Sequence, residues 1–187
     1  LGASHAEGEV DSVAEYISSD CDCVAIAAIE AAGRIGGEKA LEAIMAEVAT
    51  EGEGKVYDAA IATLLAFNGK IDDAVVAALE GNDNSKAAAL QILKKRRITK
   101  AADKVLAMAG EGCEAAVKAL PTVAAEQNFD ALCEMLIAGK GDKTSVSNAI
   151  IKSLKELSSA EQVKRIEEKM GKTDKVHLFY PILAATG

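Results

Sequence analysis

Residues 24–37, which read VAIAAIEAAGRIGG, carry the clearest structural signal in the chain. Their apolar positions recur at intervals of three, four and seven residues, which is the spacing of a helix with one buried face. The paired alanines in the middle leave room for a neighbouring helix to approach closely. The glycines at the end favour termination, because glycine readily adopts the left-handed conformation that follows a helix. The stretch therefore predicts an amphipathic helix that ends at Gly36-Gly37.

The same pattern returns along the chain, as in a repeat protein. Four further copies lie at residues 56–64, 85–93, 112–120 and 146–154, and residues 176–184 form a weaker one. The equivalent positions, spaced 27 to 34 residues apart, are Ile29, Ile61, Leu90, Val117, Ile151 and Pro181. One copy and its partner helix cannot bury their own apolar face, so the copies are expected to stack on one another.

A second amphipathic segment accompanies each copy. A short opening segment and five longer ones lie at residues 10–17, 39–49, 71–79, 101–108, 129–138 and 161–170. Ser158 and Glu161 have the Ser-x-x-Glu spacing of a capping box, in which each side chain accepts from the backbone of the other at a helix start. Helix N-caps are also expected at Asp20, Thr99 and Asn128, because their side chains can accept such hydrogen bonds.

The composition supports a fold built only of helices. Apolar residues make up 50% of the chain and aromatic residues only 3%. No run rich in Val, Ile and Thr alternates with a period of two, which argues against a β-sandwich or a β-barrel. We therefore predict an all-α fold, an α-solenoid (superhelix) of about six antiparallel helix pairs. Residues 1–8 are expected to be a disordered N-terminal tail and residues 9–187 a single repeat domain, either complete or a fragment of a larger protein.

The register of the repeat also predicts which side chains form the core. The residues expected to be buried are Ile29, Ile61, Leu90, Val117, Leu120, Ile151 and Leu154. Phe67, Phe129 and Phe179 fall on apolar stripes as well, so we expect them in the core. Pro121 and Pro181 are expected to bend their helices, because the proline ring removes one hydrogen bond and clashes with the preceding turn.

The repeated motifs resemble a known family. VAIAAIEAAGRIGG (24–37), VYDAAIATLLAFNG (56–69) and CEAAVKALPTVAA (113–125) are similar to the second helix of the HEAT repeat, an armadillo-type helical repeat. The resemblance covers residues 10–185, and it implies a scaffold that binds another molecule and has no catalytic site. Tetratricopeptide repeats fit less well because they need more aromatic residues, and ankyrin repeats need a Thr-Pro-Leu-His motif that this chain lacks.

Short, alanine-rich repeats of this kind also resemble the helical modules attached to exported sugar-acting hydrolases of gut-type bacteria. That resemblance implies an alternative function, in which the chain is the accessory domain of a multidomain carbohydrate-active enzyme. It also favours a periplasmic or secreted location over a cytoplasmic one. A fold shared with such modules does not decide between the two functions, because one fold serves many functions.

Charge and hydropathy argue against two kinds of partner. The formal net charge is −8, whereas non-specific binding to nucleic acid needs a basic surface that displaces counterions from phosphate. No apolar stretch reaches the roughly 18 residues of a membrane-spanning helix. We therefore expect a protein partner, or an adjacent domain of the same polypeptide, and neither nucleic acid nor a membrane span.

The residues that carry chemistry are too few and too scattered for catalysis. Cys113 and Cys133 lie on apolar helical stripes and are expected in the core, whereas Cys21 and Cys23 are expected to be more exposed. Two thiols alone make an incomplete zinc site. The only histidines, His5 and His177, are distant in sequence from these thiols. We therefore expect no catalytic residue, no metal site and no cofactor.

The candidate partner-binding residues are mostly basic. They are Arg34, Tyr57, Lys94, Lys95, Arg96 and Arg97. The run of four cations could hold an acidic partner. It could instead compensate the negative end of a helix dipole, because it follows a helical copy. Tyr57 begins another copy and is expected to be partly exposed as an aromatic anchor.

The charge balance makes a direct prediction about nucleic acid. The protein should show no measurable binding to double-stranded DNA near physiological salt, because few phosphates could be neutralised. Fluorescence anisotropy of a labelled duplex, titrated with the protein at low and physiological salt, measures this. Micromolar binding with a steep salt dependence would contradict the prediction.

Overall fold

The computed structural model describes residues 9–67 and 69–186. It is 76% helix, and no described residue lies in a β-strand, so the predicted all-α class is confirmed. The tail predicted at residues 1–8 lies outside the described residues. The chain divides into two compact units, unit 1 (Leu1–Arg96) and unit 2 (Arg97–Gly187).

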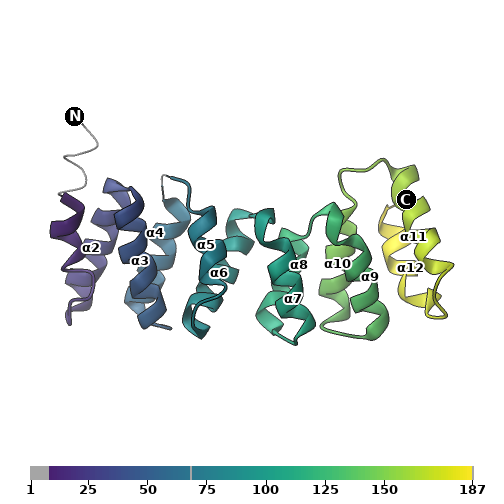
Figure 1. Ribbon diagram of the computed structural model, residues 1–187, viewed down its shortest axis with the longest axis horizontal. Coiled ribbons are helices and arrows are strands. Elements are labelled where there is room, and N and C mark those ends of the chain that lie inside the picture. Colours follow the sequence, from purple (N-terminus) through teal and green to yellow (C-terminus); the bar gives the residue numbers. More distant parts are fainter. Residues whose placement is uncertain (1–8, 68, 187) are drawn as a thin grey trace. The chain divides into compact units, whose positions relative to one another are not determined.

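In unit 1 the helices alternate between two roles. A short helical segment at residues 9–14 precedes α2 (Asp22–Ile35), α3 (Glu38–Thr50), α4 (Lys55–Ala66), α5 (Asp72–Ala78) and α6 (Asp83–Arg96). Helices α2, α4 and α6 carry the repeated pattern, and each packs against the next (Figure 1). Helix α3 packs against all three of them, and the short α5 packs against α6.

Hydrogen bonds hold the start of α6 against the end of α3. The side-chain amides of Asn82 and Asn84 donate to the carbonyl oxygen of Ala49, at 2.9 and 3.3 Å. The last carbonyls of a helix have no partner within the helix, so these amides satisfy one of them. The bonds join residues more than thirty positions apart. They hold α6 against α3, although α4 and α5 lie between these two helices in the sequence.

Unit 2 repeats this arrangement. Its helices are η1 (Thr99–Ala101), α7 (Ala102–Gly110), α8 (Glu114–Val123), η2 (Glu126–Asn128), α9 (Phe129–Ala138), α10 (Lys143–Ser153), α11 (Ser159–Met170), η3 (Val176–Leu178) and α12 (Tyr180–Thr186). Helix α8 packs against α10, and α10 packs against α12. Helices α7, α9 and α11 each pack against the next of these three, so a chain of repeated helices is again covered by their partners (Figure 1).

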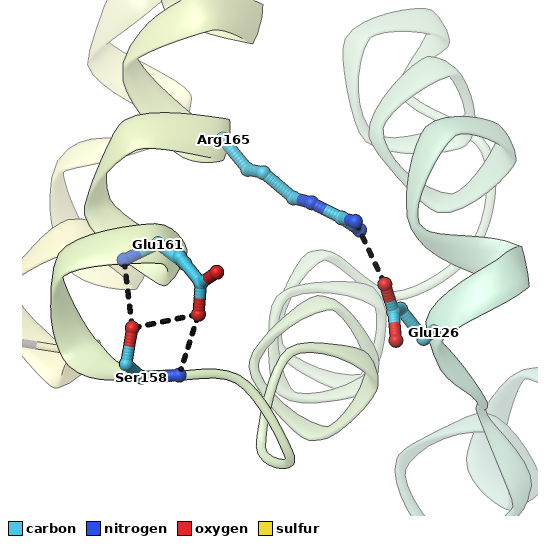
Figure 2. Close-up of polar contacts among 4 residues, drawn as sticks. All are labelled: Glu126, Ser158, Glu161 and Arg165. Atoms are coloured by element: carbon cyan, nitrogen blue, oxygen red, sulfur yellow. Dashed lines mark hydrogen bonds and ion pairs between the residues drawn. The ribbon is translucent and has the colours of Figure 1, made fainter.

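The predicted capping box at the start of α11 is confirmed. The Ser158 hydroxyl accepts from the backbone N–H of Glu161 at 3.4 Å, and the Glu161 carboxylate accepts from the Ser158 N–H at 3.2 Å (Figure 2). The Ser158 hydroxyl also donates to this carboxylate at 2.7 Å, and this bond, followed by the one from the Ser158 N–H, stabilises the ionised form and lowers the pKa of Glu161. Arg165, one turn further on, reaches Glu126 of η2 at 2.7 Å (Figure 2).

The other predicted N-caps differ from the structure. Cys21, one residue after Asp20, is the N-cap of α2, and Thr99 begins the short η1 rather than an α-helix. Asn128 is at the N-cap position of α9, but its side chain does not cap that helix. The side-chain carbonyl oxygen of Asn128 accepts from the N–H of Ala125 at 3.0 Å, and the side-chain amide group donates to the Asp103 carboxylate. The Asn128 side chain therefore joins η2 to α7.

Most of the predicted core is confirmed. Ile29, Ile61, Leu90, Val117, Leu120 and Leu154 are buried, as are Phe67, Phe129 and Phe179. The prediction for Ile151 was wrong, because Ile150 is fully buried in its place and Ile151 is half-buried. Adjacent residues point about 100° apart on a helix, so an error of one residue in the alignment of this copy moves the side chain off the buried face.

Of the two prolines, Pro121 lies late in α8, so the bend expected there stays a prediction. Pro181 is only the second residue of α12. A proline in the first turn removes no hydrogen bond of the helix, because the N–H groups there have no partner inside it. The bend expected at Pro181 therefore has no cause.

Gly33 allows α2 and α4 to approach closely. A Cβ atom at this position would overlap the Cγ2 atom of Thr63 on α4. The backbone conformation of Gly33 is helical, so its lack of a side chain, rather than its flexibility, is what the contact requires.

Replacing Gly33 with alanine should destabilise the protein. In a helix the exchange normally stabilises by up to about 1 kcal/mol. Here the new methyl group would clash with the stiff, β-branched side chain of Thr63, and overpacking of this kind costs roughly 1–3 kcal/mol. Urea unfolding, followed by the helical circular dichroism signal, should give a lower midpoint for Gly33→Ala than for the wild type.

Gly110, the last residue of α7, provides a matched control, because a Cβ atom there would meet no neighbouring atom within 4 Å. Gly110→Ala should be neutral or slightly stabilising. Thr63→Ser removes the methyl group in question, so it should rescue the stability of Gly33→Ala. If Gly33→Ala is as stable as the wild type, α2 and α4 do not approach this closely.

Candidate partner-binding surfaces

One candidate surface lies where α2 and α4 end in unit 1. Arg34, in the last turn of α2, donates from Nε to the carbonyl oxygen of Glu30 at 3.2 Å, and its Nη2 lies 3.9 Å from the Glu30 carboxylate. Gly33, Thr63 and Ala66 complete a hollow of about 270 Å³ beside these two charged residues. Because α2 and α4 both contribute from their last turns, their C-terminal ends lie at the same edge of the unit.

The C-terminal end of α6 joins this edge. Arg96, the last residue of α6, donates from Nη1 to the carbonyl oxygen of Leu64 at 3.2 Å, and so satisfies a carbonyl near the end of α4. Lys94 and Lys95 precede it and are exposed. No ion pair of these two lysines occurs among the described residues. We call Arg34, Lys94, Lys95 and Arg96 the basic edge.

The structure thus brings together most of the basic residues selected from the sequence. Arg97 is the first residue of unit 2, is exposed, and has a left-handed backbone with φ of 57°. Since Arg34 and Arg96 already bind carbonyl groups at helix ends, two members of the basic edge have a structural task. Lys94 and Lys95 are the members that remain available to a partner.

The expectation for Tyr57 was wrong. Tyr57 is only 9% exposed. This burial raises the pKa of its phenol, and the negative charge of Asp58 raises the pKa further. Tyr57 is the first of four residues, with Ala60, Ile61 and Leu64, that form the buried stripe of α4. It therefore contributes to the core of unit 1 and cannot be an exposed anchor.

A second candidate surface, in unit 2, was missed by the sequence reasoning. Three lysines and an imidazole surround a hollow of about 340 Å³ with a partly apolar floor. We call it the basic hollow; its polar members are Lys140, Lys143, Lys175 and His177, and its apolar floor is made of Leu136, Ile137 and Leu178.

The turn after α9 places the first two lysines. Gly139 adopts the left-handed conformation, with φ of 71°, and its N–H bonds to the carbonyl of Leu136 at 3.1 Å. The N–H of Lys140 bonds to the carbonyl of Met135 at 3.0 Å, which closes the end of α9 in the manner of a Schellman motif. Two residues later Asp142 caps α10, so Lys143 begins that helix.

The other side of the basic hollow comes from the segment between α11 and α12. Lys175 donates from Nζ to the carbonyl oxygen of Ile137 at 2.7 Å, which ties this segment to the last turn of α9. His177 and Leu178 of η3 follow directly and line the hollow. The site is therefore held by hydrogen bonds from two segments that lie more than thirty residues apart.

The chemistry of the basic hollow suits a ligand that is both acidic and apolar. Ammonium groups attract carboxylates, and the leucine and isoleucine of the floor can bury apolar side chains. Asp142, which lies between Gly141 and Lys143 in the sequence, accepts from the N–H of Ser145 at 2.8 Å, and this bond lowers the pKa of Asp142. Asp142 therefore has a structural partner, whereas the exposed Lys140 and Lys143 make no ion pair among the residues described.

A weak signal for this site was present in the sequence. Residues 139–143 read GKGDK, in which two lysines flank a helix start and two glycines allow a tight turn. Nothing in the sequence placed Lys175 and His177 beside them, because the contact depends on how α12 packs against α10. A run of adjacent residues such as Lys94–Arg97 can be recognised in the sequence. A cluster of residues that only folding brings together cannot.

The cysteines differ sharply in their surroundings. Cys133 is fully buried in α9, and this burial raises the pKa of its thiol to about 12, so it is confirmed as a core residue. Cys113 is only half-buried, because it lies at the N-cap of α8 instead of on its buried face, and the core expectation for it was wrong. Cys21 and Cys23 are exposed, as expected.

Neither a protein-family model, nor a curated protein, nor a solved structure matches this chain. Within residues 9–67 and 69–186, no helix is both long enough and apolar enough to cross a membrane. The same residues hold no cluster of three or more His, Cys, Asp or Glu side chains that could bind a metal ion.

Arg96 and Lys94 should behave differently when each is replaced with alanine. Arg96→Ala removes a charged hydrogen bond to the end of α4 and should lower the free energy of unfolding by roughly 1 kcal/mol, since the group is partly exposed. Lys94→Ala should change it by less than about 0.5 kcal/mol. Urea unfolding of both variants measures the difference. Equal stability of the two would mean that Arg96 does not support α4.

Proposed function

We propose that this protein is a non-catalytic binding module, and that each of its units is a stack of three HEAT-like antiparallel helix pairs, six in the whole chain. Each unit contains three copies of the repeated sequence. The packing of α2 on α4 and α4 on α6, and of α8 on α10 and α10 on α12, supports this assignment. An experimental structure in which these neighbours do not pack side by side would contradict it.

The partner is a protein segment that carries both carboxylates and apolar side chains, and its docking site is the basic hollow. The observation that carries this proposal is the gathering of Lys140, Lys143 and Lys175 around an apolar floor, on a protein whose net charge is −8. Because these lysines are clustered on a protein that is negative overall, they create a local positive field that attracts an acidic segment. Burial of apolar side chains on the floor then adds affinity that charge alone would not provide.

The basic hollow is favoured over the basic edge for two reasons. The edge is flanked by Glu30, which already pairs with Arg34. The edge also lies at helix C-termini, where the macrodipole is negative and opposes an anionic ligand. The basic hollow also adjoins the C-terminal end of α9, but Lys143 is the first residue of α10, so the positive end of that helix lies beside the same hollow and offsets the negative end of α9.

The partner segment can belong to a separate protein or to a neighbouring domain of the same polypeptide, as in an accessory module. Both sources present the same chemistry to the basic hollow. Binding to a solenoid is spread over several repeats, with a few anchors that dominate. Lys140 and Lys143 are the anchors in this proposal, since both are exposed and lie at the mouth of one hollow.

A pair of charge reversals tests the proposal. The probe is a synthetic peptide of alternating glutamate and leucine, compared with one in which glutamine replaces every glutamate. The wild type should bind the glutamate peptide more tightly, and added salt should weaken that binding. The double variant Lys140→Glu/Lys143→Glu should bind it at least roughly tenfold more weakly, which corresponds to about 1.4 kcal/mol. Isothermal calorimetry or fluorescence anisotropy measures both affinities.

Lys94→Glu/Lys95→Glu is the matched control, because it changes the net charge of the protein by the same amount at the basic edge. Its affinity should stay within about twofold of the wild type, since these two lysines do not line the basic hollow and exposed charges are screened by salt. A loss of affinity in this control but not in the hollow variant would move the docking site to the basic edge. No preference for the glutamate peptide over the glutamine peptide would refute the proposed partner chemistry.

A further inference from the structure

Two exposed thiols lie side by side at the start of α2. Cys21 is the N-cap of this 14-residue helix and Cys23 lies in its first turn. Their Sγ atoms are 2.6 Å apart, which is closer than unbonded sulfur atoms normally approach. An S–S bond is about 2.05 Å long, so the two sulfurs are within about 0.6 Å of bonding distance.

The backbone at the helix start holds the two thiols in this position. Cys21 has an extended backbone, with φ of −97° and ψ of 109°, and its carbonyl oxygen accepts from the N–H groups of Val24 and Ala25 at 2.9 and 3.0 Å. Its own N–H bonds to the hydroxyl of Ser19 at 3.3 Å. The chain on both sides of Cys21 is therefore fixed, and the extended conformation turns its side chain toward that of Cys23.

The two thiols are not equivalent. The hydrogen bond from Cys23, followed by the N–H of Val24, lowers the pKa of Cys21. The same pairing raises the pKa of Cys23. The positive end of the α2 dipole also favours a thiolate at the N-terminus, while the charge of Asp22 opposes it. Cys21 is therefore the thiol of the pair that ionises more readily.

We propose that Cys21 and Cys23 form a thiol–disulfide exchange site, whose substrate is an accessible disulfide of a small thiol compound such as glutathione or of an exposed protein cystine. The inference is independent of the proposed partner binding. It follows from the distance between the two sulfurs, their exposure and their place at a helix start.

The exchange proceeds in two displacements. The Cys21 thiolate attacks one sulfur of the substrate, which breaks the substrate S–S bond, forms a mixed disulfide and releases one thiolate that takes a proton from water. Cys23 then loses its proton and attacks Cys21 Sγ, which releases the second thiolate and closes the Cys21–Cys23 disulfide. Two electrons pass from the protein sulfurs to the substrate, and one disulfide is exchanged for another.

The remaining cysteines explain why the reaction is confined to this pair. The buried thiol of Cys133, with its pKa raised to about 12, is almost wholly protonated at neutral pH and shielded from a substrate. Cys113 is half-buried and is a single thiol in its part of the chain, so it has no adjacent thiol with which to close a disulfide.

The test treats the 187-residue chain, fully reduced, with oxidised glutathione at pH 8. The wild type should release two glutathione molecules per chain and lose two hydrogen masses, and peptide mapping should locate the new disulfide between Cys21 and Cys23. Cys23→Ser should stop at the mixed disulfide and retain one glutathionyl group on Cys21. Cys21→Ser should slow glutathione release by roughly tenfold or more, because the more readily ionised thiol of the pair is removed.

Cys113→Ser should react as the wild type does and serves as the control. Helical circular dichroism of all variants confirms that they are folded, which the exposure of both sites favours. A wild type that accumulates stable mixed disulfides and forms no Cys21–Cys23 bond would overturn the proposal. A Cys21→Ser variant that releases glutathione as fast as the wild type would overturn it as well.

Discussion

The close packing of each repeated helix on the next is the contact on which the rest of the structure depends. A helix pair of this size leaves one apolar face uncovered, and only a neighbouring pair can cover it. Small residues make this possible in unit 1, where α2 and α4 meet at Gly33 and Thr63 with no space for another atom. The sides of the helices are taken up by this packing. The caps, turns and surface clusters therefore lie at the helix ends.

Much of the fold follows from the period of the apolar residues. The helix class, the capping box at Ser158 and six of the seven predicted core positions in the repeat alignment could be obtained in this way, because they depend on residues within a few turns of each other. Ile151 and Tyr57 could not. Each lies near the boundary of a buried stripe, and a rotation of the helix by one residue, which only packing against neighbours determines, changes its exposure.

The candidate surfaces show the same limit at a longer range. The sequence displays the run Lys94–Arg97, but not that Arg96 is committed to the end of α4. The basic hollow is harder still to predict, because its two halves are far apart in the chain and are brought together by the packing of α12 on α10 and by the hydrogen bond from Lys175 to Ile137. Side-chain hydrogen bonds to backbone carbonyls leave no trace in composition or spacing, and they decide which charges remain available.

The close contact between Gly33 of α2 and Thr63 of α4 has a consequence for how this sequence can change over time. Where backbones nearly touch, a larger residue has no alternative rotamer that avoids the clash, so drift at such positions is limited to residues of the same size. Exposed positions one step around the same helix carry no such restriction. Related chains would therefore be expected to keep a small residue at the position of Gly33 while their charged surfaces diverge, so this position should vary less than the chain as a whole.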